Sequence, residues 1–378
     1  MATVDEKNPG DESSGHGGGI LDTVSYSQQS ATLRSFNPQS FISEYLMSLK
    51  PRDKQVLMAR YGLEDGTEQT LEQIGKKMNL TRERVRQIEK ESLRKLETAP
   101  LGANLKGAVE LIFQIIEEHG EIMREITLLD ALLVAGSNEV NRRAVLFILQ
   151  VVPRFSLFAG DEKYHRAWYV AGLDWETIAK ISTAGNAVFE QAQKPQKRDA
   201  VLRAVREELG QDTMNMSDEV LENYLSLAVM FARNSFGEWG LTAWPEIKPR
   251  DIGDKAFLVL QHHGKPEHYA QIAEMINKQS FDRRLAHKET VHNELIKDER
   301  FVLVGRGIYA LKKWGFQKGV VADIIAGVLR DASSPLSRDE IVSRVMKQRL
   351  VKKNTIIVGL ANRKLFKKTE DNKYINAE

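Results

Sequence analysis

Residues 70–96 read TLEQIGKKMNLTRERVRQIEKESLRKL, and this stretch decides the fold of the chain around it. Thr70 and Gln73 have the spacing of a capping box, which predicts that a helix begins there. Asn79 tolerates the left-handed conformation of a tight turn, so the helix should end at it. Thr81 then suits the N-cap of a second helix. The pattern predicts a helix-turn-helix whose second helix turns one face inward: Val85, Ile88, Ser92 and Leu96.

The outward face of that second helix carries side chains that suit the major groove of DNA. Arginine pairs with guanine, glutamate accepts from cytosine and glutamine pairs with adenine, and recognition helices present such groups from their first turns. A solvated face of surface ion pairs is the alternative. The preceding helix and turn favour DNA reading by this face, whose members are Arg82, Glu83, Arg86, Gln87, Lys90 and Arg94.

Residues 38–97 resemble region four of the bacterial primary sigma factors. The runs LKPRDKQVLMARYGL (49–63), TLEQIG (70–75) and TRERVRQIE (81–89) carry the resemblance. In that family the domain reads the minus thirty-five promoter element and packs on the flap of the polymerase β subunit. The resemblance therefore implies two partners, double-stranded promoter DNA and the RNA polymerase core.

The same resemblance assigns roles to single positions. Arg82, Glu83 and Gln87 match base-contacting residues, while Arg84 and Arg86 match basic positions near phosphates or polymerase. Arg60 in the preceding helix resembles a basic residue that faces the DNA backbone, with an ordinary surface charge as the alternative. Together with the cap and the next turn, the candidate DNA-binding set is Thr81, Arg82, Glu83, Arg84, Arg86, Gln87, Lys90 and Arg60.

Composition narrows the class of protein. The 378 residues are 28% charged and 42% hydrophobic, which is typical of a soluble globular protein, and the net charge of +2 averages over segments of opposite sign. The lack of cysteine excludes disulfides, thiolate zinc sites and a cysteine nucleophile. No apolar run reaches membrane-spanning length, and no signal-peptide core is present. These features predict a cytoplasmic, nucleoid-associated protein without a membrane partner.

Residues 1–35 have few apolar side chains to bury and should form a disordered arm. The glycine-rich run at 15–19 suggests phosphate binding, but no Gly-Lys-Ser/Thr follows it. The helix-turn-helix domain should then occupy residues 36–98.

Residues 252–315 have the pattern of a winged helix. Helices are expected over Asp254–His262, Glu267–Lys278 and Lys288–Lys297, followed by two strands in 301–311 around Arg306-Gly307. This segment resembles the HARE-type helix-turn-helix family, whose relatives include the N-terminal domain of the polymerase delta subunit. The same order of elements recurs before and after it. We therefore expect a mainly α fold with small β-hairpin wings, the region-four-like domain being followed by winged-helix units at 104–172, 173–247, 251–316 and 319–378.

The last of these units is basic. Between Arg344 and Lys373 ten basic residues face two acidic ones. Such an excess suits a phosphate backbone, and a solubilising surface is an equally good interpretation. Base reading is not supported here. The candidate phosphate contacts open the third helix of the unit: Lys352, Lys353 and Asn354.

Signals of catalysis are lacking. No two of the eight histidines have the H-x-x-x-H spacing of a metal site, and there is no Walker motif, nucleophile elbow or dinucleotide fingerprint. The Asp161-Glu-Lys163 run resembles part of a nuclease site but falls in an expected wing turn. We predict no enzyme activity, no cofactor, no metal and no small-molecule substrate.

The leading functional hypothesis is a DNA-binding transcription factor associated with RNA polymerase. A complete sigma factor would carry a region that melts the minus ten element ahead of region four, and only a short arm precedes it in this sequence. The chain is therefore not expected to act as a complete sigma factor. Two alternatives remain, a free-standing DNA-binding regulator and a protein-binding scaffold of winged helices.

Overall fold

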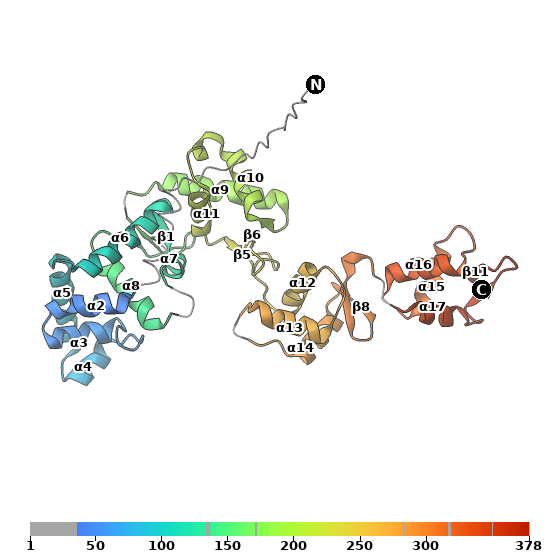
Figure 1. Cartoon of the computed structure of the whole chain (residues 1–378), viewed down its shortest axis with the longest axis horizontal. Coiled ribbons are helices and arrows are strands. Elements are labelled where there is room, and N and C mark those ends of the chain that lie inside the picture. The colour runs from blue at the N-terminus through green and yellow to red at the C-terminus, as the bar shows by residue number, and fades with distance from the viewer. Residues whose placement is uncertain are drawn as a thin grey trace, which may run out of the picture. The chain divides into compact units, whose positions relative to one another are not determined.

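The structure is a computed structural model in which helices joined by short strands follow one another along the chain (Figure 1). It describes residues 36–133, 137–170, 172–282, 284–316, 319–349 and 351–377. The expected arm at 1–35 lies outside these residues. Two compact units are present, one reaching to Ala184 and including Arg206–Val229, the other formed by Gly185–Val205 and the chain from Met230 onward. None of the described helices is long and apolar enough to cross a membrane.

The first described elements are α2 (Pro38–Tyr45), η1 (Leu46–Ser48), α3 (Pro51–Arg60), α4 (Leu71–Met78) and α5 (Arg82–Thr98). The capping box is present: Thr70 Oγ1 accepts from the backbone N of Gln73 at 3.3 Å, and Gln73 Oε1 accepts from the backbone N of Thr70 at 2.8 Å. Asn79 ends α4 in the left-handed region with φ of 55°, and Thr81 Oγ1 caps α5 by accepting from Arg84 N at 3.1 Å. The predicted helix-turn-helix is confirmed.

A small apolar core joins α3, α4 and α5, and it consists of Val56, Ile74, Val85 and Ile88. Gly75 allows the turn to close tightly, because a Cβ atom there would lie 2.7 Å from the carbonyl oxygen of Leu80. Ser92 and Leu96 are also buried, as predicted for the inward face of α5.

A winged-helix unit follows directly. Its elements are α6 (Ala103–Glu118), β1 (Ile122–Arg124), α7 (Glu125–Leu132), α8 (Glu139–Val151), β2 (Ser156–Phe158) and β3 (Ala167–Tyr169). The strands form an antiparallel sheet in the order β1-β3-β2. This unit and the helix-turn-helix share one hydrophobic core, to which both contribute: Ile42, Tyr45, Leu46, Leu57 and Leu96 from one, and Ile112, Phe147, Ile148 and Trp168 from the other.

The next repeat along the chain is α9 (Trp175–Ala192), β4 (Gln196–Lys197), α10 (Arg198–Leu209), η2 (Gly210–Thr213), α11 (Asp218–Leu227), β5 (Phe231–Arg233) and β6 (Glu238–Leu241). Its sheet has the order β4-β6-β5. β5 and β6 form the hairpin of this repeat, with Phe231 opposite Leu241. The division between the two compact units falls within this repeat and not at its predicted ends. The unit bounds predicted from the sequence, such as 173–247, therefore remain predictions.

The third repeat contains α12 (Ile252–His263), β7 (Glu267–His268), α13 (Tyr269–Gln279), α14 (Lys288–Lys297), β8 (Phe301–Gly305), β9 (Ile308–Leu311) and η3 (Lys312–Trp314), with strand order β7-β9-β8. The helix expected from Glu267 was placed two residues too early. Glu267 and His268 pair with Tyr309 and Ile308 as a strand, and His268 then caps α13.

The fourth repeat contains α15 (Val321–Arg330), α16 (Arg338–Gln348), α17 (Lys353–Leu360), β10 (Phe366–Lys368) and β11 (Tyr374–Asn376). Beside the β10-β11 hairpin, Leu336 forms an isolated antiparallel bridge with Tyr374, at the place where the other repeats have their first strand. The fold is therefore mostly helical with small antiparallel sheets, as predicted, and each repeat has a strand or bridge between its first two helices that sequence reasoning missed.

Candidate nucleic-acid interface

The exposed face of α5 brings the predicted DNA-binding side chains together. Arg82, Glu83, Arg84, Arg86, Gln87 and Lys90 are all exposed. Val85 and Ile88 between them are buried and fix the rotation of the helix about its axis. Because an α-helix has 3.6 residues per turn, packing of these apolar side chains keeps the polar side chains on the solvent side.

Two pairs of side chains organise this face. The Arg86 guanidinium donates twice to the Glu83 carboxylate, from Nε to Oε2 at 2.8 Å and from Nη2 to Oε1 at 2.6 Å. Arg84 Nη1 donates to Gln87 Oε1 at 3.2 Å. The hydrogen bonds in which Arg86 donates lower the pKa of Glu83 and raise the pKa of Arg86. Glu83 is ionised at neutral pH and lies on the exposed face of α5.

Arg60 lies apart from this exposed set. Its Nε donates to Glu89 Oε1 at 3.1 Å and its Nη1 donates to the carbonyl oxygen of Gln69 at 3.3 Å. The side chain is about one-third exposed. The structure thus places Arg60 as a brace between α3 and α5. No local pattern predicts this role, because Glu89 is 29 positions away.

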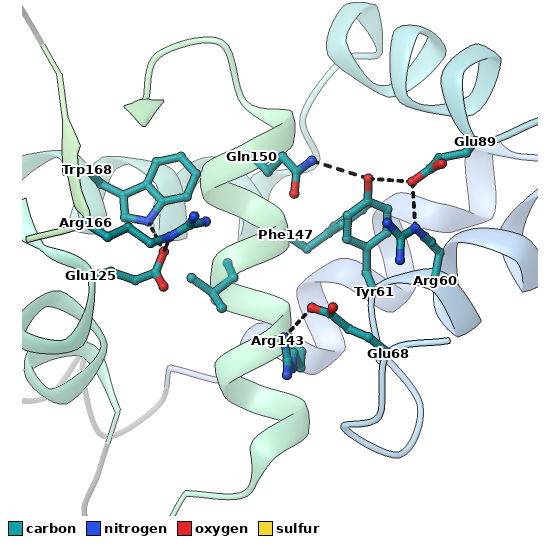
Figure 2. A pocket seen from close by; sticks show the side chains of 11 residues that line it. Arg60, Tyr61, Glu68, Glu89, Glu125, Arg143, Phe147, Gln150, Arg166 and Trp168 are labelled. Atoms are coloured by element: carbon teal, nitrogen blue, oxygen red, sulfur yellow. Dashed lines mark hydrogen bonds and ion pairs between the residues drawn. The ribbon is translucent and has the colours of Figure 1, made fainter. Parts of the chain in front are cut away.

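A pocket of about 640 Å³ lies beside this brace, between the helix-turn-helix and the first winged-helix unit (Figure 2). Its lining residues are Arg60, Tyr61, Glu68, Glu89, Glu125, Arg143, Leu146, Phe147, Gln150, Arg166 and Trp168. Every guanidinium in it has a carboxylate partner: Arg60 with Glu89, Arg143 with Glu68, and Arg166 with Glu125 at 2.6 Å.

Tyr61 is at the centre of the contacts across this pocket. Its hydroxyl donates to Glu89 Oε1 at 3.1 Å and accepts from Gln150 Nε2 at 3.3 Å, as the dashed lines in Figure 2 show. Its ring lies edge-on to Phe147, with 5.0 Å between centroids. Burial, and then the charge of Glu89, raise the pKa of Tyr61. The arrangement fixes α8 against α3 and α5 and leaves no unmatched charge for a ligand.

A second hollow of about 580 Å³ lies on the helix-turn-helix itself, between α3 and α4. Met58, Ala59, Ile74 and Met78 supply apolar walls. Two lysines and one glutamate complete the charged part of its lining: Lys54, Lys77 and Glu64.

The predicted phosphate contacts of the last repeat lie where expected. Lys352 occupies the N-cap of α17, Lys353 and Asn354 form its first turn, and all three are exposed. Lys353 Nζ lies 3.3 Å from Asp339 Oδ1 in an exposed ion pair.

Asp161, the first residue of the run that resembles part of a nuclease site, accepts hydrogen bonds within its own turn. Asp161 Oδ1 accepts from the backbone N atoms of Lys163 and Tyr164 at 2.8 and 2.7 Å, so it shapes the predicted turn between β2 and β3. Across the described ranges, no group of three or more His, Asp or Glu side chains is placed to hold a metal ion.

Comparisons with known proteins match the same segment. Residues 45–97 fit the family model described as Sigma-70, region 4. The RNA polymerase sigma factor SigA of Nostoc sp. is 56% identical over 55 residues, which are 15% of this chain and 14% of the relative. SigA1 of Synechococcus elongatus is 59% identical over 51 residues, 14% of this chain and 13% of the relative. SigA of Clostridium acetobutylicum is 39% identical over 99 residues, 26% of each protein. This chain thus spans about a quarter of the last relative's length and less of the other two.

Proposed function

We propose that this chain is a promoter-DNA-binding transcription factor that works with RNA polymerase through its sigma-like helix-turn-helix. The exposed face of α5 carries the proposal, because it lies inside the segment that matches Sigma-70, region 4. The relatives that match there are RNA polymerase sigma factors. The expected target is a minus thirty-five-like element.

In this proposal the first two turns of α5 enter the major groove. Arg82 and Gln87 contact base edges, and Glu83 accepts from cytosine while Arg86 divides its donors between Glu83 and the DNA. Thr81 fixes the start of the helix, and Arg84 and Lys90 approach phosphates on either side. Arg60 supports the interface through Glu89, and its contact with a phosphate would require that pair to open.

The test compares a minus thirty-five duplex with a scrambled duplex of equal length. Arg82→Ala and Gln87→Ala should each reduce the preference for the promoter duplex, since one good bidentate contact is worth roughly 1–3 kcal/mol of discrimination. Arg203→Ala, which removes an exposed arginine from α10, is the charge-matched control for Arg82→Ala and should leave the preference unchanged. Equal binding of both duplexes by the wild type would overturn the proposal.

The proposed protein partner is the RNA polymerase core, at its β flap. The hollow between α3 and α4 supports this contact, because it lies on the sigma-like domain and combines apolar walls with Lys54 and Lys77. That chemistry fits an apolar helix with acidic flanks. Wild type should co-elute with purified core polymerase in the absence of DNA, and the Lys54→Glu, Lys77→Glu double variant should separate from it. Clean separation of the wild type would instead favour a free-standing regulator.

We further propose that the chain assists polymerase and does not replace a whole sigma factor. The matched part corresponds to region four of the relatives, and winged helices follow it. Residues 251–316 are proposed as a HARE-type winged helix. The left-handed Gly264 after α12 and the β8-β9 hairpin around Gly307 support that assignment. Such a function places the chain at the nucleoid in the cytoplasm.

A scaffold role for part of the chain has its own support. The third helices of the first two repeats, α8 and α11, pack on other parts of this chain within the first compact unit. These repeats therefore suit the positioning of α5 better than contact with DNA.

A further inference from the structure

The third helix of each repeat occupies the place of a recognition helix, but the first two such helices are covered. Helix α8 faces the helix-turn-helix, where Phe147 contacts the Tyr61 ring and Gln150 donates to the Tyr61 hydroxyl. Arg143, on the same helix, pairs with Glu68. This surface is therefore occupied by the chain itself.

Helix α11 is covered by the first repeat. Nδ2 of the buried Asn223 donates to the carbonyl oxygens of His119, at 2.7 Å, and Ile122. The Tyr224 hydroxyl donates to the carbonyl oxygen of Gly120 at 2.9 Å. The approach is so close that a Cβ atom on Gly120 would lie 2.7 Å from a methyl carbon of Val220.

The third helices of the last two repeats are open. The outer faces of α14 and α17 consist of exposed side chains: Lys288, Glu289, Thr290, Asn293, Ile296 and Lys297 on the first, and Lys353, Asn354, Thr355 and Val358 on the second. Only α17 adjoins a strong charge excess, because two glutamates balance the two lysines of α14.

The fourth repeat has more exposed basic side chains without a carboxylate partner than the first, where Lys106 and Lys163 are of this kind. In the first repeat Arg142, Arg143, Arg154 and Arg166 each have a carboxylate partner. In the fourth, six exposed basic side chains form no ion pair with any carboxylate in the described ranges: Lys347, Lys352, Arg363, Lys364, Lys367 and Lys368. Unmatched like charges repel one another and destabilise a small domain, whereas a surface that serves only solubility is best served by mixed signs.

We propose that the fourth repeat binds the phosphate backbone of duplex DNA without reading its sequence, through Lys352 at the N-cap of α17 and Lys367 and Lys368 of the β10-β11 hairpin. Lys353 joins them by exchanging its exposed ion pair with Asp339 for a phosphate. Lysine is a point charge that suits phosphate oxygens, and arginine, the usual guanine reader, is lacking from the open face of α17. This second contact stands apart from the promoter reading proposed for α5.

The experiment measures the affinity of the full chain for a scrambled duplex at several salt concentrations, by fluorescence anisotropy. Each neutralised phosphate contributes about 0.9 to the slope of log affinity against log salt. A Lys352→Gln, Lys353→Gln, Lys367→Gln, Lys368→Gln variant should therefore lose roughly 3.6 from that slope. A control with the same charge change, Lys106→Gln, Lys163→Gln, Lys194→Gln, Lys248→Gln, alters exposed lysines on the other repeats and the loops near them and should keep the wild-type slope.

The outcomes separate this inference from the proposed function. An unchanged slope in the first variant would overturn the inference even if promoter preference persists. If the variant has a reduced slope but the wild type shows no preference for the promoter duplex, the fourth repeat binds phosphate as inferred. The proposal that α5 recognises promoter sequence would then be wrong. Unchanged duplex binding with lost co-elution of core polymerase would mean that the lysines face an acidic protein surface, which would also overturn it.

Discussion

The Tyr61 hydroxyl, at the end of α3, lies 3.3 Å from Nε2 of Gln150 on α8. The same oxygen lies 3.1 Å from Oε1 of Glu89 on α5, so one side chain connects three helices from two modules. Because Glu89 belongs to the proposed recognition helix, the orientation of α5 depends on a winged-helix repeat that has no DNA contact of its own in our proposal.

Removal of this hydroxyl should weaken the joint. Tyr61→Phe keeps the ring contact with Phe147 and loses two hydrogen bonds, each with a net value of about 1 kcal/mol. We expect the free energy of unfolding, measured in urea, to fall by roughly 1–2 kcal/mol. Gln150→Leu should cost less, since Tyr61 then keeps its bond to Glu89. A larger loss for Gln150→Leu would contradict the assignment of Tyr61 as the centre of the joint.

Alkaline pH should loosen the same region. Burial raises the pKa of Tyr61, Tyr45 and Tyr224 above the ordinary 10.0. The folded state holds these protons more tightly than the unfolded state, so their contribution to stability is complete below pH 10 and is lost as pH rises through the folded-state values. Urea unfolding at increasing alkaline pH should show this decline, and Tyr61→Phe should make it shallower. A stability that stays constant above pH 10 would contradict the raised pKa values.

Two helix glycines should respond oppositely to alanine. Gly107, in α6, has open space around an added Cβ, so Gly107→Ala should stabilise the fold by about 1 kcal/mol through helix propensity. Gly75→Ala should destabilise by roughly 1–3 kcal/mol, because its Cβ would meet the Leu80 carbonyl oxygen at 2.7 Å. Thermal unfolding of the two variants, compared with wild type, tests both signs. If Gly75→Ala also stabilised the protein, the tight turn after α4 would be wrong.

Glu83→Gln should change DNA binding in two directions. The substitution removes a negative charge from the α5 face and weakens the hold on Arg86. Affinity for any duplex should rise at low salt. The preference for the promoter duplex should fall, because one carboxylate acceptor becomes an amide donor and the remaining oxygen loses its charge. Competition binding between promoter and scrambled duplexes measures both. Glu91→Gln, an exposed position on α5 outside the proposed contacts, is the control and should raise affinity less without loss of preference.

Asn223 offers a test of the α11 contact. Asn223→Ala leaves the carbonyl oxygens of His119 and Ile122 without a donor and should cost roughly 1–3 kcal/mol. Asn223→Asp should cost more, because its carboxylate would face those oxygens in a buried site. Burial raises the pKa of such a carboxyl group, so acidification should restore part of the loss in the Asp variant only. Equal pH dependence of the two variants in urea unfolding would contradict this contact.

The parts of the fold that sequence reasoning recovered rest on signals only a few residues apart. The capping box at Thr70 and Gln73, the left-handed Asn79 and the cap at Thr81 each act within one turn, and each was predicted from its own side chain. The exposed face of α5 followed from the same local period. These features depend little on the rest of the chain.

The features that were missed involve partners far apart in the sequence. The two residues of β7 are too short for an alternating pattern, and their strand exists because β9, some forty positions later, pairs with them. The brace between Arg60 and Glu89 crosses two helices. Likewise, nothing in the composition of α8 or α11 distinguishes a covered helix from an open one, so the division of the repeats into covered and open became visible only in three dimensions.

The single core that the helix-turn-helix shares with the first repeat also governs how the protein can be dissected. A fragment that stopped at the end of α5 would leave the side chains of Tyr45, Leu46 and Leu96 without the repeat that buries them. It would present an apolar face to solvent and tend to self-associate. Because α11 in turn covers the first repeat, with Leu227 in one core with Ile122 and Ala167, a piece suited to study in isolation extends at least through α11.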